Sequence, residues 1–191
     1  GNNFPKWEKK RLSSFMVERN EQAPKSDQYP LMAFVAHKGV THKGERYDRE
    51  FLVNDCGNKN YKRTEYGDFI YSSNNLEAGS IGLNCYGSAS ISPVYSIFKI
   101  AESCHTKFIS SYLIRKSFLS KMVRYRQGVI YGQWRIHEAD FLRIEEEIPS
   151  TEEQQKIADF LNSLDKAIEA KQQQITLAEN WKKGLMQGLF I

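Results

Sequence analysis

Apolar side chains recur in alternating steps of four and three residues through the last forty positions of the chain. This heptad spacing is typical of a helix whose apolar seam packs against a partner helix, as in a coiled coil. Lys171 and Lys182 fill the two places where the series lacks an apolar residue. A helix of this length would extend roughly 50 Å, at about 1.5 Å per residue. The seam consists of Ile157, Leu161, Leu164, Ile168, Ile175, Ala178, Leu185 and Leu189.

Polar residues mark the start of this helix. Ser150 and Glu153 form a capping-box pattern, and no proline follows them. Acidic residues in the first turn and Lys182 and Lys183 near the other end suit the helix dipole. We therefore predict one long helix over residues 150–191. The alternative is an ordinary helix packed along its own domain, although helices beyond about 25 residues are typical of coiled coils or repeats.

The rest of the chain alternates short apolar runs with turn residues. Runs of strand length occupy residues 29–35, 69–73, 79–83 and 88–98, separated by Gly and polar positions. Helical spacing of apolar residues predicts a helix over about 106–123. The pattern indicates an α+β fold: a compact domain with a twisted, mostly antiparallel sheet and flanking helices, followed by the long C-terminal helix.

Two domains follow from this reading, one over residues 1–147 and the helical one over 148–191. Polar composition predicts loops over residues 20–27, between Gly39 and Gly44, and over 124–128. Gly79, Gly82 and Gly87 match no phosphate-binding motif, so we interpret them as turns.

Composition narrows the class of protein. Apolar content of 40% and aromatic content of 13% are typical of a globular chain, and no apolar run is long enough to span a membrane. The three cysteines are far apart and form no C-x-x-C pair, which predicts free thiols in a reducing cytoplasm rather than a zinc or redox site. Of 27 basic and 23 acidic groups, 22 and 17 precede Thr151, so the surplus of positive charge belongs to the globular part.

The segment from Ser103 to His137 contains seven Lys and Arg residues and no Asp or Glu, with aromatic residues interleaved. Cations on its outer face could neutralise phosphates, and Arg and Gln side chains can pair with guanine and adenine edges. Two further basic patches lie at 38–50 and 59–63, although solvated surface is the competing interpretation for each patch. The candidate DNA-binding residues are Lys38, Lys43, Arg46, Arg49, Lys59, Lys62, Arg63, Lys121, Arg124, Arg126, Gln127 and Arg135.

Motifs of catalysis are missing from the sequence. The run that begins at His137 is not H-E-x-x-H, and there is no nucleophile elbow, Walker loop or methyltransferase motif of the Asn/Asp-Pro-Pro-aromatic type. We therefore expect no catalytic residue, no metal and no cofactor in this chain. A nuclease is a remote alternative, because Asp48, Glu50 and Asp55 are the only loose candidates for metal ligands.

Several segments resemble the specificity (S, HsdS) subunits of type I restriction–modification systems. Tyr66-Gly67-Asp68 is similar to a Gly-Asp turn of that family, and the helix resembles its conserved helical region through Ile148-Pro149, Glu153-Gln154-Gln155-Lys156-Ile157-Ala158, Leu164-Asp165 and Lys182-Lys183-Gly184-Leu185-Met186-Gln187-Gly188-Leu189-Phe190.

The resemblance implies a non-catalytic domain that recognises one half of a split duplex DNA target. It implies docking to methyltransferase subunits that carry S-adenosylmethionine and to restriction subunits that use ATP and Mg²⁺. A complete S subunit has two recognition domains and two helices. This chain has one of each, so we expect half of a longer subunit or a half-subunit that forms an antiparallel homodimer through its helix. The alternative is a structural coiled-coil module with a ligand-binding β domain and no role on DNA.

Overall fold

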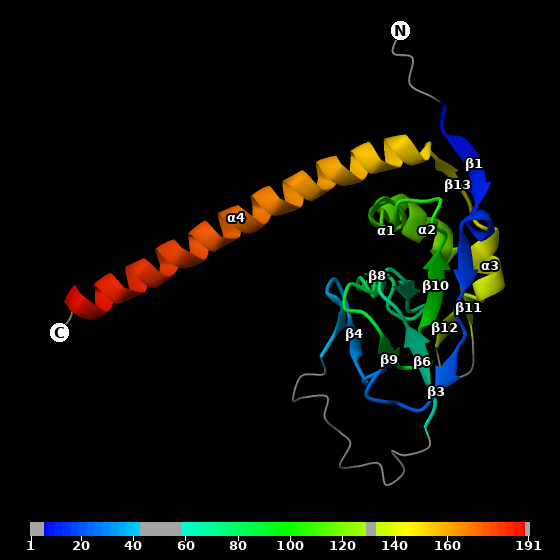
Figure 1. The fold of residues 1–191 in the computed structure, drawn as a ribbon, viewed down its shortest axis with the longest axis horizontal. Helices are drawn as coiled ribbons and strands as arrows, with labels where there is room; N and C mark the ends of the chain where they lie inside the picture. Colours follow the sequence, from blue (N-terminus) through cyan, green and yellow to red (C-terminus); the bar gives the residue numbers. More distant parts are fainter. Residues whose placement is uncertain (1–5, 43–58, 129–132, 190–191) are drawn as a thin grey trace.

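The computed structural model of the chain describes residues 6–42, 59–128 and 133–189. It consists of a globular body and one helix, α4 (Thr151–Leu189), that starts on the body and then projects away from it (Figure 1). The body contains α1 (Thr106–Leu113), α2 (Lys116–Val123), α3 (Glu138–Arg143) and the 3-10 turn η1 (Leu12–Ser14). The mixed α+β class and the long C-terminal helix are as predicted.

The strands of the described part pair antiparallel in five small sheets. The largest has the order β2-β10-β7-β8, another has the order β3-β6-β9, and three are two-stranded, β1-β13, β4-β5 and β11-β12. The prediction of antiparallel pairing is confirmed, but the strands form several small sheets rather than one. Their bounds are β1 Glu8–Arg11, β2 Met16–Glu18, β3 Gln22–Ala23, β4 Ala33–Val35, β5 Gly39–Thr41, β6 Tyr61–Thr64, β7 Phe69–Tyr71, β8 Ile81–Leu83, β9 Ala89–Ile91, β10 Ser96–Ile100, β11 Gln127–Gly128, β12 Trp134–Arg135 and β13 Glu145–Ile148.

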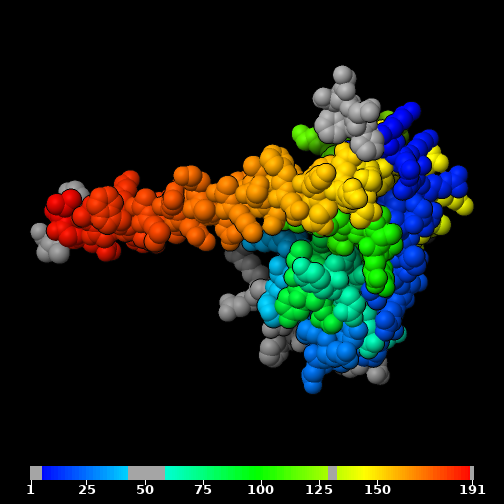
Figure 2. Space-filling view, turned by 45° about the horizontal axis from the view of Figure 1, so that its top comes forward, coloured from blue at the N-terminus to red at the C-terminus, as the bar shows by residue number. Residues whose placement is uncertain are grey.

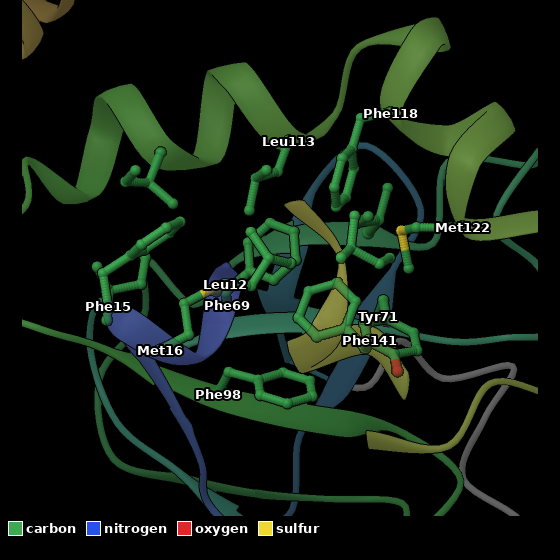
Figure 3. Close-up of a cluster of buried hydrophobic side chains, with 14 of the residues drawn as sticks. Leu12, Phe15, Met16, Phe69, Tyr71, Phe98, Leu113, Phe118, Met122 and Phe141 are labelled. Carbon is green, nitrogen blue, oxygen red and sulfur yellow. The ribbon is translucent and has the colours of Figure 1, made fainter. Parts of the chain in front are cut away.

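Phe141 of α3 lies at the centre of the main core (Figure 3). Its ring is 4.5 Å from that of Phe98 and 4.9 Å from that of Tyr71, and Phe118 of α2 meets it edge-on. Aromatic pairs at these separations add to the free energy gained by burying their area. The core therefore joins the four-stranded sheet to the helices that follow it in the chain.

The helix predicted over 106–123 is two helices, because a single helix could not bury both of its apolar groups. Ile109 and Phe118 are nine residues apart, which is about half a turn around one helix axis, yet both are fully buried in the same core. The chain breaks between α1 and α2, where Arg115 is extended and its Nε donates to the Tyr112 carbonyl at 2.6 Å. The break turns Phe118 and Met122 back toward the core.

Three segments predicted as loops contain short strands. β3 lies in 20–27, β5 starts at Gly39, and β11 occupies the end of 124–128. Each of these strands has two or three residues, too few for an alternating pattern to be visible in the sequence. Within the part of the chain that is described, no helix is long and apolar enough to cross a membrane.

Candidate nucleic-acid interface and helix seam

Helix α4 begins with half of the predicted capping box. Ser150 Oγ accepts a hydrogen bond from the Glu153 N–H at 3.4 Å. The Glu153 carboxylate accepts from the Trp7 indole N–H at 3.0 Å, rather than reaching back to Ser150. The cap therefore also attaches the helix to the N-terminal segment, which the sequence pattern alone did not reveal.

The seam residues divide into a covered and an open group. Ile157 and Leu161 are half-buried near the body, whereas every residue from Ser163 to Leu189 is exposed. Ile168 retains 67% of its accessible surface and Ile175 retains 50%. The space-filling view shows this part of α4 as an arm clear of the body (Figure 2). The open group consists of Leu164, Ile168, Ile175, Ala178, Leu185 and Leu189.

The exposed apolar surface of the arm is wider than the predicted seam. Phe160 and Trp181 are 62% and 70% exposed and lie three heptads apart, each directly before a seam position. They share one face beside the seam, because residues 21 apart return to the same heptad position. Leu177 and Met186 are also exposed. In the sequence, the apolar residues outside the four-three series could have predicted this broader surface.

Five of the candidate DNA-binding cations in the described part of the chain are in ion pairs within the body. Lys62 is buried and its ammonium lies 3.9 Å from the Glu138 carboxylate, which also pairs with Arg135 at 3.6 Å. Arg63 pairs with Glu21 at 2.6 Å, and Lys121 pairs with the buried carboxylate of Glu146. Arg126 forms a two-point pair with Glu77, with both N–O distances 2.6 Å.

Glu138 shows why two of these cations are fixed in the fold. Burial opposes ionisation of its carboxyl, but a backbone N–H, the Ser96 hydroxyl at 2.8 Å and the charges of Lys62 and Arg135 together keep the pKa of Glu138 below its ordinary value. Direct pairing with Arg126 likewise lowers the pKa of Glu77. Both carboxylates are thus held as anions that keep their cations in place.

Three candidate cations are exposed and make no ion pair with any described residue: Lys38, Lys59 and Arg124. The Lys59 ammonium lies 5.8 Å from the centre of the Tyr61 ring. Gln127 is exposed and donates a long bond to Asp140 at 3.5 Å. Lys43, Arg46 and Arg49, with Asp48, Glu50 and Asp55, lie outside the described residues. Over the described ranges, no three His, Cys, Asp or Glu side chains are placed to hold a metal ion.

The structure adds two exposed aromatic residues that the sequence analysis did not include among the candidate DNA-binding residues. Tyr66 is 73% exposed and Tyr86 43%, and each precedes a glycine with positive φ. The Gly67 N–H donates to the Asn84 carbonyl at 2.8 Å, which joins the turn of Tyr66 to the segment that leads to Tyr86. Tyrosine hydroxyls can donate to phosphate oxygens. In the sequence, a tyrosine directly before a glycine at a predicted turn could have indicated these exposed side chains.

A groove of about 1380 Å³ lies beside these turns, between β8 and the pair α1–α2. Its walls are mainly apolar, and Lys38, Lys107 and Lys116 provide positive charge along it. Tyr66 and Gly67 also line it. The groove therefore brings Lys38 to the same surface as the exposed turn of β6–β7.

Comparison with known proteins identifies the family of this chain. A family model described as "Type I restriction modification DNA specificity domain" matches residues 5–180. No curated protein matches the sequence.

Solved structures share the fold. The HsdS subunit from Thermoanaerobacter tengcongensis superposes with a TM-score of 0.54 at 19% identity, over 89% of this chain and 40% of that one. A chain from work on complex assembly and conformational transition of the type I R-M system gives 0.55 at 17%, over 89% and 41%. The type I S subunit from M. genitalium gives 0.54 at 17%, over 88% and 41%. The chain thus spans about two-fifths of the length of each. Because the family model covers nearly the whole sequence, the chain belongs to the family of type I restriction modification DNA specificity domains.

Proposed function

We propose that this chain recognises one half of a split duplex DNA target, as a specificity subunit or part of one in a type I restriction–modification complex. The family match over residues 5–180 carries the proposal. The exposed cations Lys38, Lys59 and Arg124 and the exposed tyrosines of the turns support it. Cations and hydroxyls would position the body on the phosphates, and side chains that enter the major groove would read the bases.

The open seam of α4 requires a partner helix in this proposal. Burial of a Leu or Ile side chain contributes roughly 1.5–3 kcal/mol, so several such residues can offset the cost of association. The chain covers only about two-fifths of its structural neighbours, which leaves room for a second helix of the same kind. A second copy in an antiparallel pair would supply that helix and set Lys182 and Lys183 beside the partner's acidic first turn.

The chemistry on DNA would belong to other subunits. We expect methyltransferase subunits to dock on the paired helices and to bring S-adenosylmethionine, and restriction subunits to bring ATP and Mg²⁺. The specificity chain then directs where methyl transfer occurs without contacting the methyl donor. The expected compartment is the cytoplasm.

Titration of labelled duplex DNA at several salt concentrations tests this proposal. Binding through phosphates releases counterions, so the logarithm of the association constant should fall linearly with the logarithm of salt concentration. A single-stranded oligonucleotide of the same sequence serves as the control. Binding that is absent even at low salt would contradict the proposal and favour a structural coiled-coil module with a ligand-binding β domain.

A further inference from the structure

The joint between the body and α4 contains a buried amide. Gln154 is 2% exposed, although it lies in the second turn of a helix whose other residues are mostly open to solvent. Its Oε1 accepts from the His105 N–H at 2.9 Å, and its Nε2 donates to the Pro149 carbonyl at 2.9 Å. One side chain therefore joins the start of α1, the end of β13 and the first turns of α4.

Other contacts support the same end of the helix. Thr151 Oγ1 donates to the Ser103 carbonyl at 2.9 Å, and Ala158 is 1% exposed in the main core. Among the described residues, the hydrogen bonds and ion pairs between the body and α4 reach as far as those of Lys107 with Asn162 at 2.8 Å and with Asp165 at 3.1 Å. The Lys107–Asp165 pair is largely exposed, and such pairs restrain geometry weakly. The buried amide is thus a two-point directional contact at the joint, because both of its polar groups are used in fixed geometry.

Small changes in direction at the joint become large at the far end. From Asp165 to Leu189 the helix runs 24 residues, or about 36 Å at 1.5 Å per residue. A tilt of about 10° would move that end by about 6 Å, nearly two base pairs of DNA at 3.4 Å each. A complex that reads two half-targets at a fixed separation therefore needs this angle held closely.

We propose that Gln154 is a positioning residue that fixes the direction in which α4 leaves the recognition body, and thereby fixes the separation of the two half-targets. The first part concerns the chain alone, whereas the second part rests on the proposed function. Replacement of Gln154 by Leu would leave the His105 N–H and the Pro149 carbonyl without partners inside the joint. The joint could then restore these hydrogen bonds only by admitting water or by shifting the helix.

Pulsed EPR distances test the first part without DNA. Spin labels at Lys99→Cys in the body and Glu179→Cys on the arm would be placed in the full chain after the three native cysteines are replaced. Dilution with unlabelled protein suppresses distances between copies. The matched control is Gln155→Leu, because Gln155 is exposed and, within the described ranges, its side chain bonds to Asp159 of the same helix and not to the body.

We expect one narrow distance distribution for the labelled chain with Gln154 intact and for its Gln155→Leu variant. For Gln154→Leu we expect a distribution that is shifted or broadened by on the order of 4 Å, while the circular dichroism of the body is unchanged. If Gln154→Leu fails to fold, Gln154→Glu replaces it, since its carboxylate accepts from His105 but cannot donate to Pro149 when ionised. A folded variant of either kind with the narrow distribution unchanged would overturn the proposal.

Binding to targets with varied spacers tests the second part. Two half-targets would be placed at separations that differ by single base pairs. We expect a sharp optimum for Gln155→Leu and for the unsubstituted residue, and a shifted or flattened optimum for Gln154→Leu, with equal affinity of all three for a single half-target. An equally sharp optimum for Gln154→Leu would overturn the link to spacing. If the unsubstituted chain and both variants fail to bind DNA, the proposed function is contradicted. The EPR distances would still test whether Gln154 fixes the direction of α4.

Discussion

The base and the arm of helix α4 have the same kind of sequence but opposite surroundings. At the base, Ala158 and Gln154 are buried and Ile157 and Leu161 are partly covered by the body. Along the arm, apolar residues such as Ile168 and Leu177 retain about two-thirds of their accessible surface. Heptad spacing therefore identifies the helix, but it does not distinguish the part that completes its own domain from the part that requires a partner.

The difference assigns separate roles to the two parts. The base fixes a direction through hydrogen bonds and core contacts, and the arm offers an apolar surface beyond the body. Changes at the base should affect the folding of the body, whereas changes on the arm should affect association alone. The following substitutions separate these effects.

The largest effect is expected on the arm, from Leu164→Asp combined with Ile168→Asp. Each chain of a pair would lose two buried apolar residues and gain two charges in the seam, a loss of more than about 4 kcal/mol of association free energy. Light scattering during gel filtration should report a dimer for the unsubstituted chain and a monomer for the double variant. The thermal midpoint of the monomeric body should stay unchanged. A monomer in both cases, at tens of micromolar, would remove self-association from the account.

A smaller but still severe effect is expected at the base, from Ala158→Asp. A carboxylate at this position would lie among the apolar side chains of the described core, and its burial should cost about 3 kcal/mol of folding free energy. Denaturant unfolding measures this loss. The matched control is Ala170→Asp, which makes the same change on the exposed arm outside the seam and should shift the folding free energy by less than about 0.5 kcal/mol. Equal losses for the two variants would refute the division of the helix.

Within the body, Arg124→Ala and Arg126→Ala should separate DNA contact from folding. Arg124 is exposed without a described ion pair, so its loss should weaken DNA binding about tenfold at low salt and leave stability unchanged. Arg126 is largely buried against Glu77, so its loss should destabilise the body by about 1 kcal/mol. Anisotropy titrations and thermal melts of both variants make the comparison. Unchanged binding by Arg124→Ala would exclude this residue from the interface.

The smallest effect is expected from Lys107→Ala, which removes the contacts of Lys107 with Asn162 and Asp165 of α4. Its exposed pair with Asp165 should contribute no more than about 1 kcal/mol to folding. Denaturant unfolding should detect at most this change, and the EPR distance distribution should remain narrow because Gln154 is intact. If the distance distribution of Lys107→Ala were as broad as that of Gln154→Leu, the Lys107–Asp165 pair rather than the Gln154 amide would fix the direction of α4.

Long-range pattern made the helix and the fold class predictable. The heptad series from Ile157 to Leu189 extends over about nine helical turns, and Ser150 with Glu153 marks the start of the helix, so the helix is visible without knowledge of its neighbours. The break between α1 and α2 was not visible in the same way. It depends on Phe118 and Ile109 facing one core, which only the packed body defines.

Charge composition alone does not show which cations are free of ion pairs within the folded body. The acid-free segment from Ser103 to His137 is basic in sequence, but Arg126 pairs with Glu77, 49 residues away, and Lys121 pairs with Glu146, 25 residues away. Only the pair of Arg135 with Glu138, three residues on, was visible locally. Local sequence cannot show which distant carboxylate a cation meets after folding. In the loop over residues 124–128, Arg124 is therefore the cation without an ion pair to any described residue.

Selection of binding sites from a pool of random DNA duplexes tests the central claim most directly. The full chain would be used at a concentration where it self-associates, with the Leu164→Asp, Ile168→Asp double variant in parallel. The account predicts that the unsubstituted chain enriches one short motif, present twice in inverted orientation at a fixed separation, because a two-fold pair of bodies reads two-fold related half-targets. The double variant should enrich the same motif singly and more weakly. An enriched pool without any motif, from protein that is folded and paired, would contradict sequence recognition by this chain.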